Sequence, residues 1–162
     1  YLAQFFRVIS QENSADIYQA AKDSDYYIGA VHEDEPANGE ELVNILLNKG
    51  DRNIGLIGWE QGDATWLGRW EGYKAGVDKW NEEHPDDQAK LSEPQYAGTT
   101  SEGGSKAAEA LMAADPNLDA LIPAGGGGDP LQGAIAAVER AGKTADIRHR
   151  FYRLPSRPWR QT

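Results

Sequence analysis

Short apolar runs alternate with longer amphipathic stretches from residue 26 to residue 147, and this alternation restricts the fold more than any other feature. The strand-like runs are 27–31, 54–58, 90–97, 118–123 and 147–152. The stretches with helical spacing are 36–48, 65–82, 101–114 and 130–141. Strands joined by helices form right-handed crossovers, which place the strands parallel in one sheet. The sequence therefore predicts an α/β fold of three layers, a parallel sheet with helices on both faces.

Ligands of such sheets bind beyond the carboxyl ends of the strands. This rule selects four segments as candidate ligand loops, at 32–34, 59–66, 97–100 and 125–129.

The chain has 162 residues, which is enough for one domain with a sizeable core. It contains no Cys, which excludes disulfides, thiolate metal sites and Cys nucleophiles. No run approaches the roughly 18 apolar residues that cross a bilayer. The chain begins at Tyr1 without an initiator Met, which favours a fragment or a processed form.

The charges are unevenly distributed. The chain carries 16 Lys and Arg against 26 Asp and Glu, and its formal net charge is −10. Nucleic-acid binding needs a surplus of basic residues, so we expect no nucleic-acid partner. Residues 148–162, however, contain five Arg and no acidic residue. This basic tail is either an arm for a polyanion or membrane surface, or, as we prefer, a non-native end read from another frame.

Several segments occur in an order that is similar to a known family. After the strand at 54–58, a loop leads to the sequence RWEGY at 69–73. The sequence NLDALI at 117–122 precedes a Gly-rich loop and a helix, and DEPANGEEL and RVISQEN occupy 34–42 and 7–13. These segments resemble the type I periplasmic sugar-binding proteins, whose fold also occurs in the effector domains of lac-repressor-like regulators.

The resemblance covers roughly residues 7–147 and implies a Rossmann-like or flavodoxin-like lobe. Residues 1–25 would form the end of a first lobe and the hinge crossing, and residues 26–147 the second lobe. Most of the first lobe would precede Tyr1, so the resemblance implies an incomplete part of a two-lobed protein.

Three candidate ligand residues follow the strand at 54–58. Arg69 matches the family's Arg that donates to sugar oxygens, and a guanidinium offers five donors in a fixed fork. The alternative for Arg69 is a surface ion pair with Asp63 or Glu71. Trp59 and Trp66 offer indole faces for stacking on a sugar ring, and the alternative for each is a place in the core.

The remaining candidates come from the resemblance and lie in other loops. Glu12 and Asn13 fall where the family has polar ligand contacts, with plain loop solvation as the alternative. Gly127 stands where the family usually has an Asn contact. Asp129 is either a ligand residue or an N-cap with Pro130 at the first helical position. The family's last Asp contact has no counterpart near residue 150.

Several other kinds of site find little support. The three His lack metal-ligand spacing, so we expect no metal. His32 with its acidic neighbours is an acid/base cluster or, preferably, a solvated turn. No Gly-x-Ser-x-Gly elbow is present, and residues 125–128 lack the spacing of a phosphate or dinucleotide loop. We therefore expect no enzyme and no cofactor.

The resemblance implies a solute-binding component of an ABC-type sugar transport system, which binds a monosaccharide or polyol between two lobes. Its partners would be that sugar and a membrane permease, and its place would be periplasmic or extracellular, at the membrane. Two alternatives stay open. One is the effector domain of a lac-repressor-like regulator, and the other is a small flavodoxin-like enzyme that holds a phosphate at 125–128.

Overall fold

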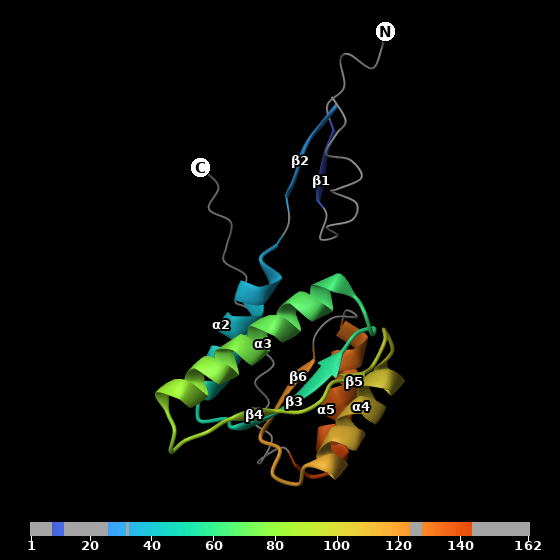
Figure 1. Cartoon of the computed structure of the whole chain (residues 1–162). Helices are drawn as coiled ribbons and strands as arrows, with labels where there is room; N and C mark the ends of the chain where they lie inside the picture. The colour runs from blue at the N-terminus through green and yellow to red at the C-terminus, as the bar shows by residue number, and fades with distance from the viewer. Residues whose placement is uncertain (1–7, 12–25, 32, 124–127, 144–162) are drawn as a thin grey trace, which may run out of the picture.

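The computed structural model describes residues 8–11, 26–31, 33–123 and 128–143, and Figure 1 draws the rest in grey. The described elements are β1 (Val8–Gln11), β2 (Tyr27–Val31), α2 (Glu35–Leu47), β3 (Asn53–Gly58), α3 (Ala64–Glu83), β4 (Lys90–Leu91), β5 (Gln95–Tyr96), α4 (Ser101–Ala114), β6 (Ala120–Pro123) and α5 (Gly128–Arg140). All four predicted helices are present, and each of their ends lies within two residues of its predicted position. The predicted strand at 147–152 lies outside the described residues.

The main sheet is built around β3, with which β4, β5 and β6 all pair in parallel. β4 pairs with the start of β3 and β5 pairs with its end, so the strand predicted at 90–97 is interrupted. Pro94 lies in the interruption and has no N–H to donate to a strand ladder. The backbone N–H of Leu56 instead donates to the Ser92 hydroxyl oxygen at 2.9 Å.

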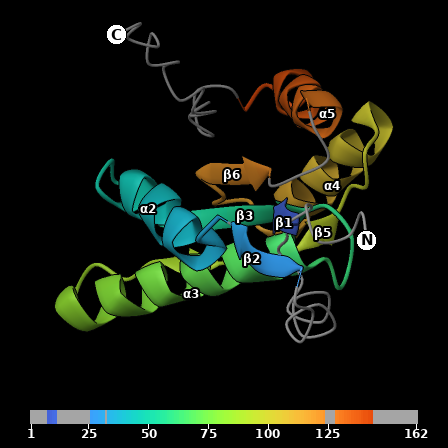
Figure 2. The ribbon, with the colours of Figure 1, turned by 90° about the horizontal axis from the view of Figure 1, so that it is seen from above.

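Helices cover both faces of this sheet, as the sequence predicts. Helices α2 and α3 lie together on one face, and α4 and α5 lie on the other (Figures 1 and 2). Side chains of a β-strand alternate between faces. Ile54 and Leu56 accordingly join the core beneath α2 and α3, whereas Ile57 joins the core beneath α4 and α5. The predicted three-layer α/β fold is confirmed.

The strand β2 does not pair with β3 in the described part of the chain. It pairs in parallel with β1, in register from Ile9 opposite Gly29 to Gln11 opposite Val31, and the two form a separate small sheet (Figure 1). The alternating pattern predicted the strand but not its partner. Whether the division between lobes falls near residue 26 stays a prediction.

Helix starts are fixed by side-chain oxygens. Asp34 caps α2, Asp63 caps α3 and Thr100 caps α4, each by accepting a hydrogen bond from the backbone N–H three residues on. Of the two alternatives for Asp129, the N-cap with Pro130 at the first helical position is wrong. Helix α5 begins at Gly128, so Asp129 and Pro130 both lie in its first turn, where a missing N–H costs no intrahelical bond.

No described helix has both the length and the apolar composition needed to cross a bilayer.

Candidate functional site

The carboxyl ends of β3 and β5 meet at one edge of the sheet. Gly58 at the end of β3 is paired with Tyr96 at the end of β5. The pairing continues past both strands, because the N–H of Ala97 donates to the Gly58 carbonyl at 2.9 Å and that of Gly98 to the Trp59 carbonyl at 3.0 Å. We call residues 58–60 and 96–100 the carboxyl edge. The loop after β6, which includes Gly127, lies outside the described residues.

The start of α3 is held against this edge. Gly62 takes a φ of 89°, a left-handed conformation that favours glycine, and turns the chain back toward the sheet. Asp63 then accepts a 2.7 Å hydrogen bond from the N–H of Trp66 and fixes the first turn. Trp66, Leu67 and Arg69 therefore lie in the turns of α3 nearest the strand ends.

Trp66 lies in the core. It is 2% exposed, and its ring stacks with Trp70 at a centroid distance of 6.2 Å and an interplanar angle of 15°. Tyr73 and Tyr96 lie against it at 6.2 and 6.3 Å. This burial favours the core alternative that the sequence left open for Trp66.

Trp59 is the first residue after β3 and is partly buried. Its indole Nε1 is buried and has no hydrogen-bond partner among the described residues, and the same is true of Nε1 of Trp66. A buried donor without a partner costs about 1–3 kcal/mol, so two such donors, one directly after β3 and one in the first turn of α3, are unusual.

Arg69 pairs with acidic groups that the sequence did not predict. Its Nε donates to Glu35 Oε2 at 2.6 Å, and its Nη2 lies 3.4 Å from Glu35 Oε1 and 3.9 Å from Glu33 Oε2. The described contacts of this guanidinium are with Glu33 and Glu35, not with the predicted surface partners Asp63 and Glu71. The pair with Glu35 uses Nε and Nη2 and so fixes the orientation of the guanidinium.

The environment of Arg69 explains how its charge is held. The Glu35 side chain is only 6% exposed and that of Arg69 is 29% exposed. Burial acts to lower the pKa of Arg69, but the hydrogen bond and charge of Glu35 outweigh it, and the pKa is raised. The guanidinium is therefore a permanent cation whose charge is balanced by two carboxylates.

The structure gives little information on the other four predicted ligand residues. Glu12, Asn13 and Gly127 lie outside the described residues. Asp129 is exposed in the first turn of α5.

Two exposed residues near the edge were missed by the sequence reasoning. Leu67 is 38% exposed in the first turns of α3, and Tyr96 is 40% exposed at the end of β5. The sequence signal for Tyr96 is its place at the end of a predicted strand, at the edge where ligands of such sheets bind.

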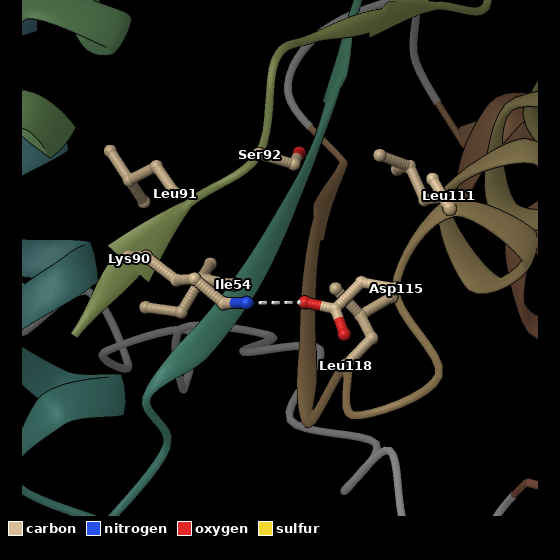
Figure 3. Close-up of a pocket in the computed structure, with 8 residues that line it drawn as sticks. Ile54, Lys90, Leu91, Ser92, Leu111, Asp115 and Leu118 are labelled. Atoms are coloured by element: carbon tan, nitrogen blue, oxygen red, sulfur yellow. Dashed lines mark ion pairs between the residues drawn. The ribbon is translucent and has the colours of Figure 1, made fainter.

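A pocket of about 210 Å³ lies at the opposite end of the sheet. Apolar side chains of β3, β4 and α4 line it, and Lys90 and Asp115 form a 2.9 Å ion pair across it (Figure 3). The hydroxyl of Ser92 is also paired, because it accepts from Leu56 N–H and donates to the Glu93 carbonyl at 3.0 Å. The polar side chains that line this pocket are thus already paired within the protein, so the pocket suits a polyhydroxylated ligand poorly.

No family profile matches the sequence, and no curated protein matches it either. Solved structures do match its fold. An ABC transporter periplasmic solute binding protein from Actinobacillus succinogenes 130z, with bound D-allose, superimposes with a TM-score of 0.66 at 20% identity, over 85% of this chain and 46% of the other.

Two further structures show the same likeness. An ABC transporter solute binding protein from Agrobacterium vitis with bound D-fucose has a TM-score of 0.63 at 19% identity, over 84% of this chain and 43% of the other. A LacI-family sugar-binding transcriptional regulator from Escherichia coli, complexed with phosphate, has a TM-score of 0.65 at 18% identity, over 78% and 48%.

The chain spans less than half the length of each of these proteins. At such identities the likeness concerns the fold. The resemblance seen in the sequence is therefore confirmed at that level: the chain has the fold of one part of the periplasmic sugar-binding proteins and LacI-type effector domains.

Proposed function

We propose that this chain is a lobe that binds a neutral monosaccharide or polyol at the carboxyl edge of its sheet. The proposal extends to the whole protein, as the solute-binding component of an ABC-type sugar transport system with the ligand between two lobes. The structural neighbours that carry D-allose and D-fucose support a sugar as ligand.

The observation that carries the proposal is the chemistry of the loops at the strand ends. Residues 33–34, 59–63 and 97–100 supply carboxylate, amide and hydroxyl groups and contain no Lys or Arg. Arg69, the cation beside them, is already balanced by Glu33 and Glu35. Such an edge offers donors and acceptors to hydroxyl groups and no excess positive charge to a phosphate.

Arg69 and Trp59 are the described residues that we propose for the ligand. Arg69 would donate from its guanidinium, and Glu35 would hold the guanidinium in place while it does so. Trp59 would contribute its ring or its unpaired Nε1. Trp66, Glu12, Asn13, Gly127 and Asp129 remain predicted contacts, and the core position of Trp66 suits a supporting role better than a direct one.

The mechanism would be closure of two lobes on the solute, with the ligand selecting the closed state. The closed protein would then dock on a membrane permease outside the cytoplasm. This is binding without chemical conversion, so we propose neither an enzymatic activity nor a cofactor.

A second candidate is the effector domain of a lac-repressor-like regulator, which the LacI-family neighbour favours. It would use the same edge for the same class of ligand. The gene sequence upstream of Tyr1 distinguishes the two, since a helix-turn-helix there supports the regulator and a secretory signal supports the receptor.

The test is a binding panel of monosaccharides, alditols, flavin mononucleotide and adenosine nucleotides, measured by calorimetry and by saturation-transfer NMR. One lobe offers half of a cleft, so we expect a neutral sugar to bind with a Kd of about 1 mM, equivalent to about −4 kcal/mol. Binding of flavin or nucleotide in place of every sugar would contradict the proposal and support the phosphate-binding enzyme.

A further inference from the structure

The pocket at the other end of the sheet takes no part in the proposed sugar site. It lies between the segment 90–92 and the carboxyl-terminal end of α4, and its volume is about 210 Å³ (Figure 3). The strand is interrupted beside this space, because β4 ends at Leu91 and β5 begins only at Gln95. Ser92, which follows β4, lines the pocket and accepts from the N–H of Leu56 in place of a backbone carbonyl.

The interior of the pocket is apolar. Ile54 and Leu91 line it from the sheet, and Leu111 and Leu118 line it from the side of α4 (Figure 3). A cavity of about 150 Å³ with an apolar lining stays dry and binds benzene. The larger space here can therefore hold one branched aliphatic side chain or one aromatic ring.

The two charged residues of the pocket face each other across it. Lys90 Nζ lies 2.9 Å from Asp115 Oδ2, and Asp115 Oδ1 accepts from the N–H of Asn117 at 2.9 Å. These two hydrogen bonds lower the pKa of Asp115, so its carboxylate is ionised at neutral pH. The Lys90 side chain is 63% exposed and that of Asp115 is 23% exposed. Lys90 is thus free to swing outward, whereas Asp115 is held by the backbone after α4.

A ligand with a single charge fits these two groups poorly. An amine bound to Asp115 would deprive Lys90 of its partner, and a carboxylate bound to Lys90 would lie close to the negative charge of Asp115. A zwitterion can place its ammonium on Asp115 and its carboxylate on Lys90. One exposed ion pair is then exchanged for two, and no charge is left without a partner.

We propose that this pocket binds a free α-amino acid with an apolar side chain, such as leucine. The ammonium and carboxylate on its α-carbon would lie between Asp115 and Lys90, and its side chain would fill the apolar interior. The site lies at the opposite end of β3 from the carboxyl edge and does not depend on the proposed sugar binding.

NMR titration of the labelled 162-residue chain with L-leucine tests the proposal. We expect a Kd of about 1–10 mM, with the largest amide shifts at residues 90–92 and 114–118. Two analogues each lack one charge, because N-acetyl-leucine has no ammonium and isoamylamine has no carboxylate. Both should bind about tenfold more weakly than leucine. Equal affinity for leucine and either analogue would refute recognition of a zwitterion.

Two neighbouring alanines provide matched variants. Both Ala113 and Ala114 are exposed at the end of α4, and Ala114 lines the pocket whereas Ala113 does not. Ala114→Leu should weaken leucine binding about tenfold, since its side chain would occupy the space, and Ala113→Leu should leave it unchanged. Lys90→Met should weaken the binding of leucine but not that of isoamylamine, which has no carboxylate to pair with Lys90.

Three outcomes would overturn the proposal: no response to leucine, shifts confined to the carboxyl edge, or equal affinities of Ala114→Leu and Ala113→Leu for leucine. The thermal unfolding midpoint of each variant, measured without ligand, separates a lost site from a lost fold. The comparison of leucine with its two analogues on the unmodified chain depends on no variant, so the proposal can fail even if a variant does not fold.

Discussion

Arg69 on α3 donates a 2.6 Å hydrogen bond to Glu35, whose carboxylate lies almost fully buried in the first turn of α2. This pair joins the two helices on one face of the sheet and orients the guanidinium near the amino-terminal ends of both helices. It thus connects the stability of the lobe with the geometry of the proposed site.

Glu35→Gln should lower the free energy of unfolding by about 1–3 kcal/mol, because it leaves a partly buried guanidinium without its ion partner. Urea unfolding measures the change. The matched control is Glu109→Gln, which removes an exposed 2.7 Å pair with Arg140 and should change the free energy of unfolding far less, because solvent screens that pair. Equal changes in the free energy of unfolding would show that the Arg69–Glu35 pair stabilises the lobe no more than an exposed ion pair does.

Arg69→Ala should weaken sugar binding by roughly 1.5–3 kcal/mol in the complete protein, the range for hydrogen bonds that involve a charged group. Calorimetry with the best sugar of the panel measures this loss. Arg140→Ala, at an exposed arginine of α5, serves as the control and should leave affinity unchanged. Unchanged affinity of Arg69→Ala would remove Arg69 from the site.

Gly72→Ala and Gly133→Ala should each destabilise the lobe by about 1–3 kcal/mol, although alanine favours helices intrinsically. A Cβ at Gly72 would overlap the carbonyl oxygen of Pro36 in α2, and one at Gly133 that of Ser101 in α4. The two glycines therefore permit the close approach of the helices on each face.

Gly128→Ala is the control for these glycines. Among the described residues, the nearest atom to its Cβ would be Nε2 of Gln132 at 4.0 Å, so the free energy of unfolding should stay the same or rise. A loss of stability as large as in Gly72→Ala would contradict the packing explanation.

Tyr73 should make stability fall at alkaline pH. Burial raises the pKa of Tyr73 to about 12, against about 10 in an unfolded chain. Because the pKa is higher in the folded protein, the stabilisation by the protonated Tyr73 phenol is complete below pH 10. This stabilisation is lost as the pH rises from 10 to 12. Tyr73→Phe should reduce the slope of unfolding free energy against pH in this interval by up to about 1.4 kcal/mol per unit. Parallel curves for the two proteins would contradict the assignment.

The fold could be predicted from the sequence because its signals are local. The apolar spacing of residues 101–114 and the capping Thr100 define α4 to the residue. Strand pairing is less local. The run 27–31 looks like any other strand of the alternation, yet it pairs with β1, since partner choice depends on contacts far along the chain.

The candidate site was predicted less completely. Its place at the carboxyl edge follows from the order of strands and helices, but the partner of Arg69 does not. Glu35 is 34 residues away in sequence, and the helix packing that brings it to Arg69 cannot be predicted from the residues next to either of them. The exposure of Tyr96 is likewise a property of the folded edge.

The most direct test of the account locates the sugar on the protein. Backbone NMR of the labelled chain, titrated with the best-binding aldose, reports which amides respond. We predict that the largest shifts fall at residues 58–60 and 96–100 and in the first turns of α3. Shifts gathered around Lys90 and Asp115 at the other end of the sheet, or no response to any sugar, would contradict the central claim.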